Sequence, residues 1–393
     1  MRQDGRSPPH SFGLDIIRVA AVLTVLFSHT ADWYLGASRA TDVFAAVVGH
    51  MAGESFYALS GFLIGGILLR AVERSPSRRL EAHALARFWL RRWMRTLPAY
   101  WAVVAALCWR FGTWDWRSLL FQQNWVPKAD WVPLTPHTWS LVLEEWFYLL
   151  LPLFVLAAGR LLRWRGLAVP AVCAALIVAC ACAREVALLH PGGFWGPDPA
   201  INPLLRLDCA SWGVLAAWAV QRWPHATGRG GAAALAVAGT AALAGLGAVS
   251  ELSYTPELLL PFGYAHWVGL WIVEHDAGMD LASACVIVGL DRLLPQGWGW
   301  AAAGVGGMAR ISYAVYLVHI PVLFLSRLGG VDDAAGWMPR LQIAALVLLA
   351  ALSLRWGVEV PVLRLRDWLT RDRPPAGAHR DGAPSPDRTS GAS

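Results

Sequence analysis

The residues best suited to chemistry stand at the two ends of the first apolar run of the chain. Arg18 and His29 bound the stretch RVAAVLTVLFSHT and are eleven positions apart. Eleven helical positions complete about three turns, so both side chains lie on one face, about 16 Å apart along the axis. An imidazole can remove a proton from a hydroxyl group, and a guanidinium binds phosphate well. The pair therefore predicts a base and an anion-binding group on a single helix.

Two adjacent carboxylates offer the histidine a partner. Glu144 and Glu145 lie about a turn and a half into the apolar run HTWSLVLEEWFYLLLP, which is expected to cross in the opposite direction. His29 and one of these glutamates are then at similar depth, and an imidazole paired with a carboxylate acts as a general base. Only one glutamate points along a given direction, because neighbouring helical positions differ by 100°. The other is expected to support packing.

The composition indicates that these ionisable groups stand in a membrane protein. The chain has 393 residues, of which 56% are hydrophobic and only 15% are charged. Soluble domains carry about 25% charged residues, and apolar stretches near 20 residues predict transmembrane helices. The net charge of +6 belongs with cytoplasmic loops rather than with nucleic-acid binding. The six cysteines lie in apolar segments without the spacing of a zinc site, so no metal is expected.

The hydropathy predicts an all-α polytopic protein of the cell membrane, with about ten transmembrane helices. The expected spans are 13–31, 43–69, 97–112, 139–159, 166–189, 203–221, 231–250, 279–295, 308–326 and 340–360. The arginine-rich stretch 70–95 is expected to be cytoplasmic, which places both termini in the cytoplasm.

Three further segments complete the predicted organisation. An eleventh apolar segment, 257–274, is expected to be re-entrant or interfacial on the outer side. Residues 1–12 form a cytoplasmic segment, 13–366 the membrane domain, and 367–393 a disordered cytoplasmic tail rich in Pro, Gly and Ser.

Six short motifs, in order along the chain, carry a resemblance to a known family. They are the spacing of Arg18 and His29, GESFYALSGFLI (53–64), FWLRRWMRTLPAYW (88–101), TWSLVLEEWFYLLLP (138–152), RISYAVYLVHIPVL (310–323) and VEVPVLRLR (358–366). Together they resemble the acyltransferase-3 family of membrane-bound O-acyltransferases. The resemblance implies transfer of an acyl group from cytoplasmic acyl-CoA, either acetyl-CoA or another short acyl-CoA. The implied acceptor is a hydroxyl of a sugar-containing molecule, either a cell-surface glycan or a secondary metabolite such as a macrolide antibiotic.

The resemblance also implies roles for residues already singled out. His29 is the expected catalytic base or, alternatively, a transient acyl carrier, and Arg18 lines the path of the donor. Arg91, Arg92 and Arg95 are spaced to share a helix face, where they are expected to bind the phosphates of coenzyme A. Alanine at position 91 or 92 is then expected to raise KM for acyl-CoA more than it lowers kcat. The alternatives are that Arg18 snorkels to the headgroups, that His29 is interfacial, and that the cluster only sets the topology.

Five further residues carry weaker signals, each with a structural alternative. Ser60 is a candidate donor-binding residue or a small residue for close helix packing. Glu54 is a candidate substrate-binding residue or half of an ion pair that holds the fold. Tyr313 and His319 recur on one helical stripe, where they bind substrate or make structural hydrogen bonds. Arg206 is expected to reach substrate or a carboxylate.

A second class of function fits the same buried charges. Intramembrane histidine and glutamate residues are also typical of proton-coupled transporters, so a carrier or flippase of acyl or saccharide groups is the alternative to an enzyme. Release of free coenzyme A from acyl-CoA separates the two. The expected partners are the lipid bilayer, acyl-CoA and a hydroxyl-bearing acceptor, and the sequence gives no signal for the oligomeric state.

Overall fold

Helices make up most of the part of the chain that the structure describes. The computed structural model describes residues 11–75, 77, 80–126, 130, 132, 135–161, 167–189, 201–253, 265–297, 299–329 and 336–370, and for 161, 188–189, 251–253 and 265–275 it describes the backbone alone. No β-strand occurs within these residues. The helices are α1 (Phe12–Ser28), α2 (Ala31–Leu35), α3 (Arg39–Arg74), α4 (Ala82–Phe111), α5 (Trp116–Leu119), η1 (Gln123–Trp125), η3 (Pro136–Thr138), α6 (Trp139–Leu161), α7 (Ala168–Leu189), α8 (Ser211–Arg222), α9 (Arg229–Ser253), α10 (Ala265–Leu293), α11 (Gly299–Leu328), α12 (Trp337–Leu354), the π-helical turn η7 (Arg355–Glu359) and α13 (Val360–Leu369).

The predicted all-helical, multi-pass membrane class is confirmed. Six stretches of the described chain are long and apolar enough to cross a membrane: Arg39–Arg74, Pro136–Arg160, Ala168–Ala187, Arg229–Ser250, Gly299–Leu328 and Trp337–Leu369. Each of the ten expected spans overlaps a helix, but α1 has 17 residues and α8 only 12, which is short for a span. The number of crossings and the side on which the termini lie stay predictions.

Four helix boundaries differ from the sequence prediction. Helix α4 begins at Ala82, so the arginine-rich segment before the expected span 97–112 belongs to the same helix. Helix α8 begins at Ser211, because residues 203–210 form turns instead of the start of a span. Residues 265–274 are the first part of α10 and continue into the expected span 279–295, so the expectation of a separate re-entrant segment is wrong there. Helix α13 extends to Leu369, three residues past the expected end of the membrane domain.

Other expectations fall outside the described residues. These are residues 1–10 of the cytoplasmic segment, Arg78 and Arg79 of the arginine-rich stretch, the first part of 257–274 and residues 371–393 of the tail.

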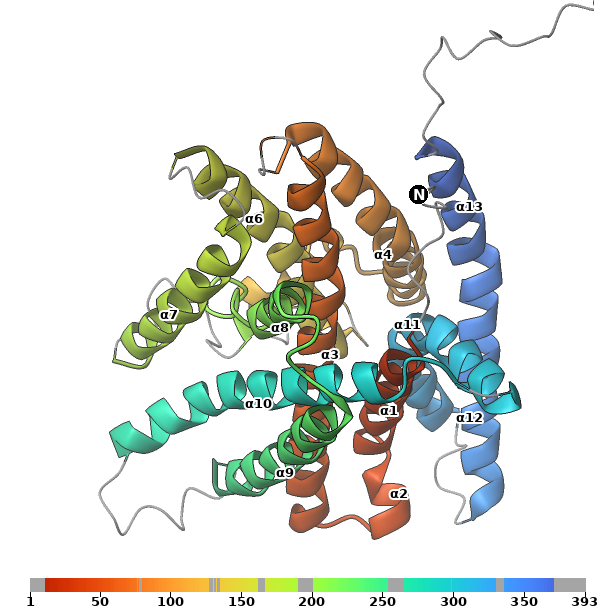
Figure 1. Ribbon diagram of the computed structural model, residues 1–393. Coiled ribbons are helices and arrows are strands. Elements are labelled where there is room, and N and C mark those ends of the chain that lie inside the picture. The colour runs from red at the N-terminus through yellow and green to blue at the C-terminus, as the bar shows by residue number, and fades with distance from the viewer. Residues whose placement is uncertain are drawn as a thin grey trace, which may run out of the picture.

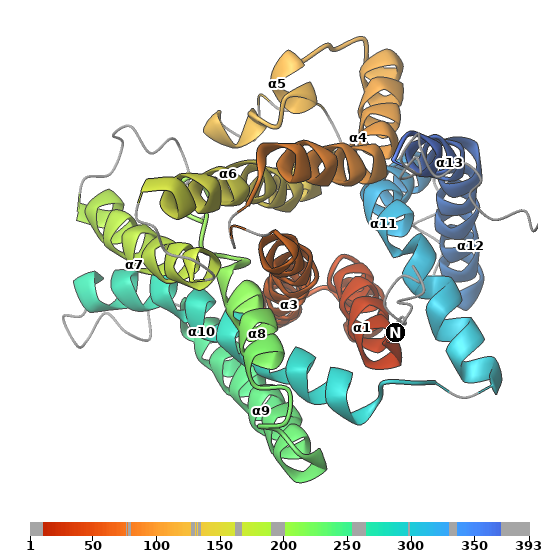
Figure 2. The same ribbon diagram turned by 45° about the horizontal axis from the view of Figure 1, so that its top comes forward.

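Helices α1 and α3 lie in the middle of the bundle. In Figure 2, α4, α6, α8, α10 and α11 surround these two helices. Residue contacts join α1 to α3, α10 and α11, and they join α3 to α8 and α10. The end of α3, the start of α4 and the end of α13 lie together at the top of Figure 1. The exposed arginines near the start of α4, such as Arg87 and Arg91, follow from this end of the bundle towards its middle.

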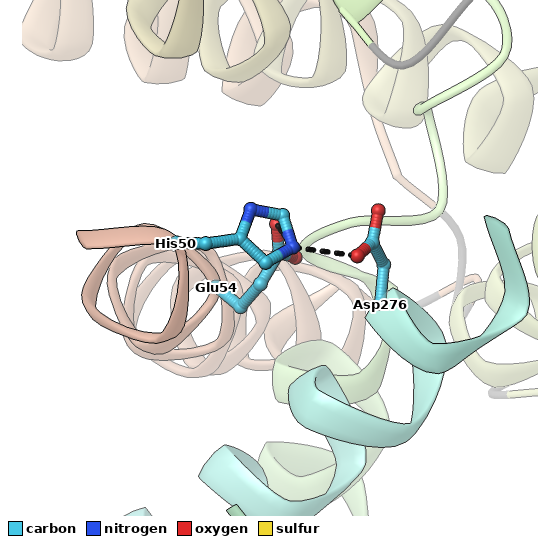
Figure 3. A group of neighbouring side chains, drawn as sticks. All are labelled: His50, Glu54 and Asp276. Carbon is cyan, nitrogen blue, oxygen red and sulfur yellow. Dashed lines mark hydrogen bonds and ion pairs between the residues drawn. The ribbon is translucent and has the colours of Figure 1, made fainter. Parts of the chain in front are cut away.

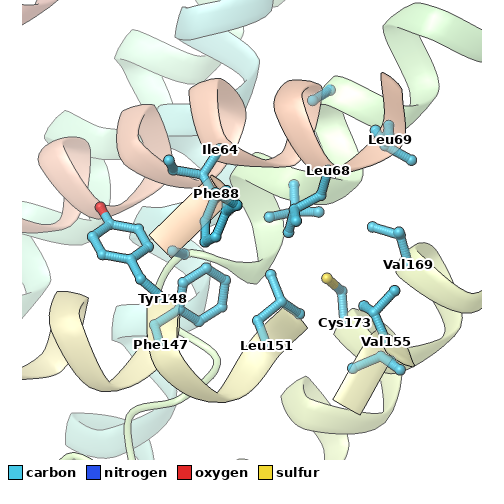
Figure 4. Close-up of a cluster of buried hydrophobic side chains, with 14 of the residues drawn as sticks. Ile64, Leu68, Leu69, Phe88, Phe147, Tyr148, Leu151, Val155, Val169 and Cys173 are labelled. Carbon is cyan, nitrogen blue, oxygen red and sulfur yellow. The ribbon is translucent and has the colours of Figure 1, made fainter. Parts of the chain in front are cut away.

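Two apolar clusters hold the central helices against their neighbours. One packs α3, α4, α6 and α7 together, with Leu68 and Phe147 completely buried (Figure 4). The other joins α1, α4, α6, α11 and α12 around residues such as Val22 and Leu317. Dense packing on both sides fixes the faces of α1, α6 and α11 that carry polar side chains.

Glycines allow α3 and α8 to touch backbone to backbone. A Cβ atom added at Gly61 would lie 1.9 Å from the carbonyl oxygen of Ala210, and one at Gly213 would lie 1.9 Å from that of Ala58. Real Cβ atoms do not approach so closely, so a side chain at either position forces the helices apart. Small residues serve this purpose at helix interfaces in membranes.

We expect Gly61→Ala to lower the free energy of unfolding by about 1–3 kcal/mol, because it overpacks this contact. Thermal unfolding of the purified protein in detergent measures the change. Gly53→Ala is the matched control on the same helix, since a Cβ there meets nothing within 4 Å. Equal melting temperatures for the two variants would contradict the close approach of α3 and α8.

Candidate active site

Three histidines from distant parts of the chain meet near one end of the bundle. His29 follows the last residue of α1, His137 lies in η3 just before α6, and His319 lies in α11. The ring centroids of His29 and His319 are 5.3 Å apart, and those of His137 and His319 are 5.0 Å apart. His29 is exposed, whereas His137 is 6% and His319 0% exposed. We call these three residues the imidazole cluster.

Tyr316 holds the two buried rings in place. Its hydroxyl donates to the backbone oxygen of His137 over 2.5 Å and lies 2.6 Å from the Ser140 hydroxyl. Its backbone oxygen lies 2.6 Å from Nδ1 of His319. The spacing of three residues brings the tyrosine and His319 onto one side of α11, as the sequence predicted for this stripe. The tyrosine thereby ties the start of α6 to α11.

The predicted pairing of His29 with Glu144 or Glu145 is wrong. A side-chain nitrogen of Arg92 lies 3.2 Å from Oε2 of Glu144, and Thr96 donates to Oε1 of Glu145 over 2.9 Å. Within the described chain neither glutamate contacts His29. Glu144 lies seven residues beyond His137, or about 10 Å further along α6, so the carboxylates are too deep to reach the imidazole cluster.

The glutamates belong to a second group of polar side chains between α3, α4 and α6. The Tyr148 hydroxyl donates to Glu144 over 2.8 Å and also hydrogen-bonds with Ser60. The guanidinium of Arg92 lies 3.9 Å from the centre of the Tyr148 ring. We call Ser60, Arg92, Glu144, Glu145 and Tyr148 the central polar cluster. Ser60 therefore makes a side-chain hydrogen bond as well as standing next to the glycine contact with α8.

Tyr313 joins the central polar cluster rather than the imidazole cluster. Its hydroxyl donates to the backbone oxygen of Thr96 over 2.9 Å. Six residues separate it from His319 on α11, or about 9 Å along the axis. The distance between the two clusters is therefore about the same along α6, from His137 to Glu144, as along α11, from His319 to Tyr313. Polar groups therefore occur at two successive levels along α6 and α11.

The predicted donor-binding arginines are separated by the structure. Arg92 turns towards α6, whereas Arg91 is exposed and makes no ion pair within the described residues. Arg95 is exposed and lies within electrostatic range of Arg18, Arg92 and Arg366. Arg18 itself donates to Asp15 over 2.9 Å. Arg91 and Arg95 are thus exposed, whereas Arg18 and Arg92 each pair with a carboxylate, and which of the four binds a donor stays a prediction.

A separate group of charges ties α3 to α10 through the segment before α8. Arg206 donates to both carboxylate oxygens of Glu54 over 2.8 Å and also pairs with Asp276. Nε2 of His50 lies 2.6 Å from Oδ1 of Asp276 and 3.8 Å from Glu54. Arg206 is 2% exposed and Glu54 0%. We call these four residues the ion cluster; the predicted substrate-binding role of Glu54 and Arg206 stays untested, and each of the two already has a charged partner.

The ion cluster also has the spacing of a metal site. Ligand atoms of His50, Glu54 and Asp276 lie within 4.8 Å of one another, and Figure 3 shows the three side chains converging. The guanidinium of Arg206 already donates to both carboxylates, however, and supplies the positive charge that a metal would bring. A cation added beside it would have to overcome that repulsion. We therefore interpret the group as a buried ion-pair network.

Sequence reasoning did not single out His137. The residue stands two positions before Trp139, at the edge of an apolar run, where a histidine is usually interfacial. Only its position beside His319 and Tyr316 marks it as a member of the cluster.

Comparison with known proteins adds an independent observation. A family model described as an acyltransferase domain matches residues 11–356. The peptidoglycan O-acetyltransferase OatA of Listeria monocytogenes is 24% identical over 383 residues, covering 89% of this chain and 55% of that protein. YrhL of Bacillus subtilis, whose name also includes the words peptidoglycan O-acetyltransferase, is 26% identical and covers 89% of this chain and 54% of its own length. The chain thus spans about half the length of these curated relatives, and no solved structure matches it.

Proposed function

The chain belongs to the acyltransferase-3 family, and from this premise we propose that it moves an acetyl or other short acyl group from cytoplasmic acyl-CoA to a sugar hydroxyl. The observation that carries the proposal is the succession of polar groups through the bundle. Arg18 and Arg95 lie beside the central polar cluster, since Thr96, the residue after Arg95, hydrogen-bonds with Glu145, and the imidazole cluster lies about 10 Å further on. Such a succession offers phosphate contacts to a donor and a base to an acceptor within one protein interior.

His29 is the base in this proposal. It is exposed, so an acceptor can reach it, and it stands beside the buried His319. An imidazole has a pKa near neutral in water and accepts the proton of a hydroxyl as the oxygen attacks the thioester. Arg18 and Arg95 bind the donor at the opposite end of α1, about 16 Å from His29 in the case of Arg18.

The names of the relatives favour a hydroxyl of a cell-surface glycan as the proposed acceptor. Two of them carry peptidoglycan O-acetyltransferase in their names, and this chain covers about half of each. A secondary metabolite such as a macrolide is the second acceptor to test. The transferase names also weigh against the carrier or flippase that the buried charges alone allow.

The proposed reaction is tested with purified protein in detergent. We expect radiolabelled acetyl-CoA to release free coenzyme A only when an acceptor is added, with label appearing on the acceptor. Peptidoglycan fragments and a macrolide are offered in parallel reactions. Binding of acetyl-CoA without release of coenzyme A in any of these reactions would remove the enzymatic proposal.

The donor-binding role predicts a specific change in kinetics. Arg95→Ala is expected to raise KM for acyl-CoA about tenfold or more and to leave kcat nearly unchanged, because a charge-assisted contact to phosphate is lost. Arg110→Ala is the control, since Arg110 is exposed at the other end of the same helix. A KM for Arg95→Ala equal to that of the control would return the arginines to a purely topological role.

A further inference from the structure

Three buried nitrogen atoms of the imidazole cluster have no hydrogen-bond partner among the residues that the structure describes. They are Nδ1 and Nε2 of His137 and Nε2 of His319. A buried polar atom without a partner costs about 1–3 kcal/mol, so folded proteins rarely keep one without a reason. Three such atoms from two side chains, gathered around the exposed His29, indicate that a polar partner is present at some stage of the protein's work.

The hydrogen bonding of His319 fixes which of its nitrogens carries the proton. A backbone carbonyl can only accept, so the contact of 2.6 Å to the oxygen of Tyr316 requires a hydrogen on Nδ1 of His319. In the neutral ring Nε2 then bears a lone pair and no hydrogen. This lone pair is the unpartnered one, and its ring lies 5.3 Å from the ring of His29.

A base needs a partner that orients it and stabilises the charge it acquires. In hydrolytic triads a buried carboxylate does this for the histidine. Here Glu144 and Glu145 lie too deep and contact Arg92 and Thr96, and Asp32, three residues after His29, pairs with Arg327 over 3.5 Å. The acceptor available to His29 in their place is the Nε2 lone pair of His319.

We propose that His319 and His137 are positioning residues for His29, forming a group of imidazoles that orients the base and shares the proton it removes. The inference rests on the proposed function. The hydroxyl O–H bond breaks and its proton passes to a nitrogen of His29, while the oxygen bonds to the thioester carbonyl carbon. The carbon–sulfur bond then breaks, and the leaving thiolate recovers the proton as coenzyme A thiol. Throughout, Nε2 of His319 accepts a hydrogen bond from the other nitrogen of His29, and His137 lies against His319.

Paired substitutions separate this role from simple packing. In His319→Asn the side-chain amide nitrogen takes the place of Nδ1 and can still donate to the Tyr316 carbonyl oxygen. No atom of the asparagine takes the place of Nε2. In His319→Gln the amide reaches the place of Nε2. In His137→Phe the ring keeps its edge contacts with Tyr316 and His319, which lie 5.4 and 5.0 Å away by ring centroids, and loses both nitrogens.

The readout is kcat and KM for acetyl-CoA, measured on the monodisperse, folded fraction of each full-length variant. We expect His319→Asn to lower kcat about 10- to 100-fold with KM unchanged, because orientation of the base is part of general-base catalysis. His319→Gln should recover part of the loss, and His137→Phe should lower kcat about tenfold. A merely structural role would reduce the yield of folded protein without changing its kcat.

Wild type and His29→Ala accompany these variants, so the two proposals can fail separately. If wild type releases coenzyme A and His29→Ala does not, while His319→Asn and His137→Phe both keep the wild-type kcat, the positioning role is overturned and the function stands. If His319→Gln is no better than His319→Asn and both change KM alone, the positioning role is overturned as well. If wild type itself releases no coenzyme A, the proposed function fails first.

Discussion

Replacing His29 with alanine is expected to lower kcat for acyl transfer by about 10²- to 10⁴-fold, the contribution typical of a general base. The side chain is exposed and makes no hydrogen bond that holds the fold within the described chain, so the variant should fold normally. KM for acyl-CoA should stay close to the wild-type value, because the donor binds near Arg95 in the proposed function. Steady-state release of coenzyme A in the presence of acceptor measures both constants.

His83 provides the control for this substitution. It lies near the start of α4 with its side chain 72% exposed and paired with Glu81 at the surface. His83→Ala should therefore leave both constants unchanged. A His29→Ala enzyme that works at the wild-type rate would mean that another group takes the proton.

Arg206→Met is expected to lower the free energy of unfolding by about 3–5 kcal/mol. The substitution leaves Glu54 and Asp276 buried without their guanidinium, and an uncompensated buried charge is far more costly than the loss of one contact. The same pair of contacts joins α3 to α10, so the variant should also yield less folded protein. Thermal unfolding in detergent, followed by near-ultraviolet absorbance of the tryptophans, reports the loss.

Arg110→Met is the matched control for the ion cluster, because this arginine is exposed and, among the described residues, makes only a ring contact with Phe111. It should melt with the wild type. In a chain this long, a loss of about 1 kcal/mol lowers the melting temperature by about 2–4 °C. An Arg206→Met variant that melts within about 1 °C of wild type would therefore mean that the buried network contributes little to stability.

The helices were predictable because the membrane imposes a length and a composition on each one. Apolar runs near 20 residues identified the segments that became α3, α6 and α11. The predicted helix boundaries were wrong where polar residues continue a helix, as at the start of α4. Hydropathy identifies the apolar part of a helix and not the residue at which the helix begins or ends. Residues 203–210 failed in the opposite sense: they were expected to start a span but form turns, and they carry the charged residues Arg206 and Asp208.

The candidate site was predictable in part, and the failures have a physical cause. Helical periodicity places Arg18 and His29 on one face of α1 whatever their surroundings are. The partner of His29 depends instead on how far α6 is shifted along its axis relative to α1. Glu144 and His137 are about 10 Å apart along that axis, and the shift in the structure brings His137 rather than Glu144 to the level of His29. Contacts such as Arg206 with Glu54, which are 152 residues apart, depend on packing that no local pattern records.

In the proposed function, one protein interior connects a donor bound near Arg95 to an acceptor bound near His29. Proteoliposomes of defined orientation test it most directly, with labelled acetyl-CoA supplied only on the side of Arg95 and an impermeant peptidoglycan fragment only on the side of His29. We predict labelled acetyl ester on the fragment, and none with His29→Ala. Ester formed only when both substrates are on the same side would contradict the claim.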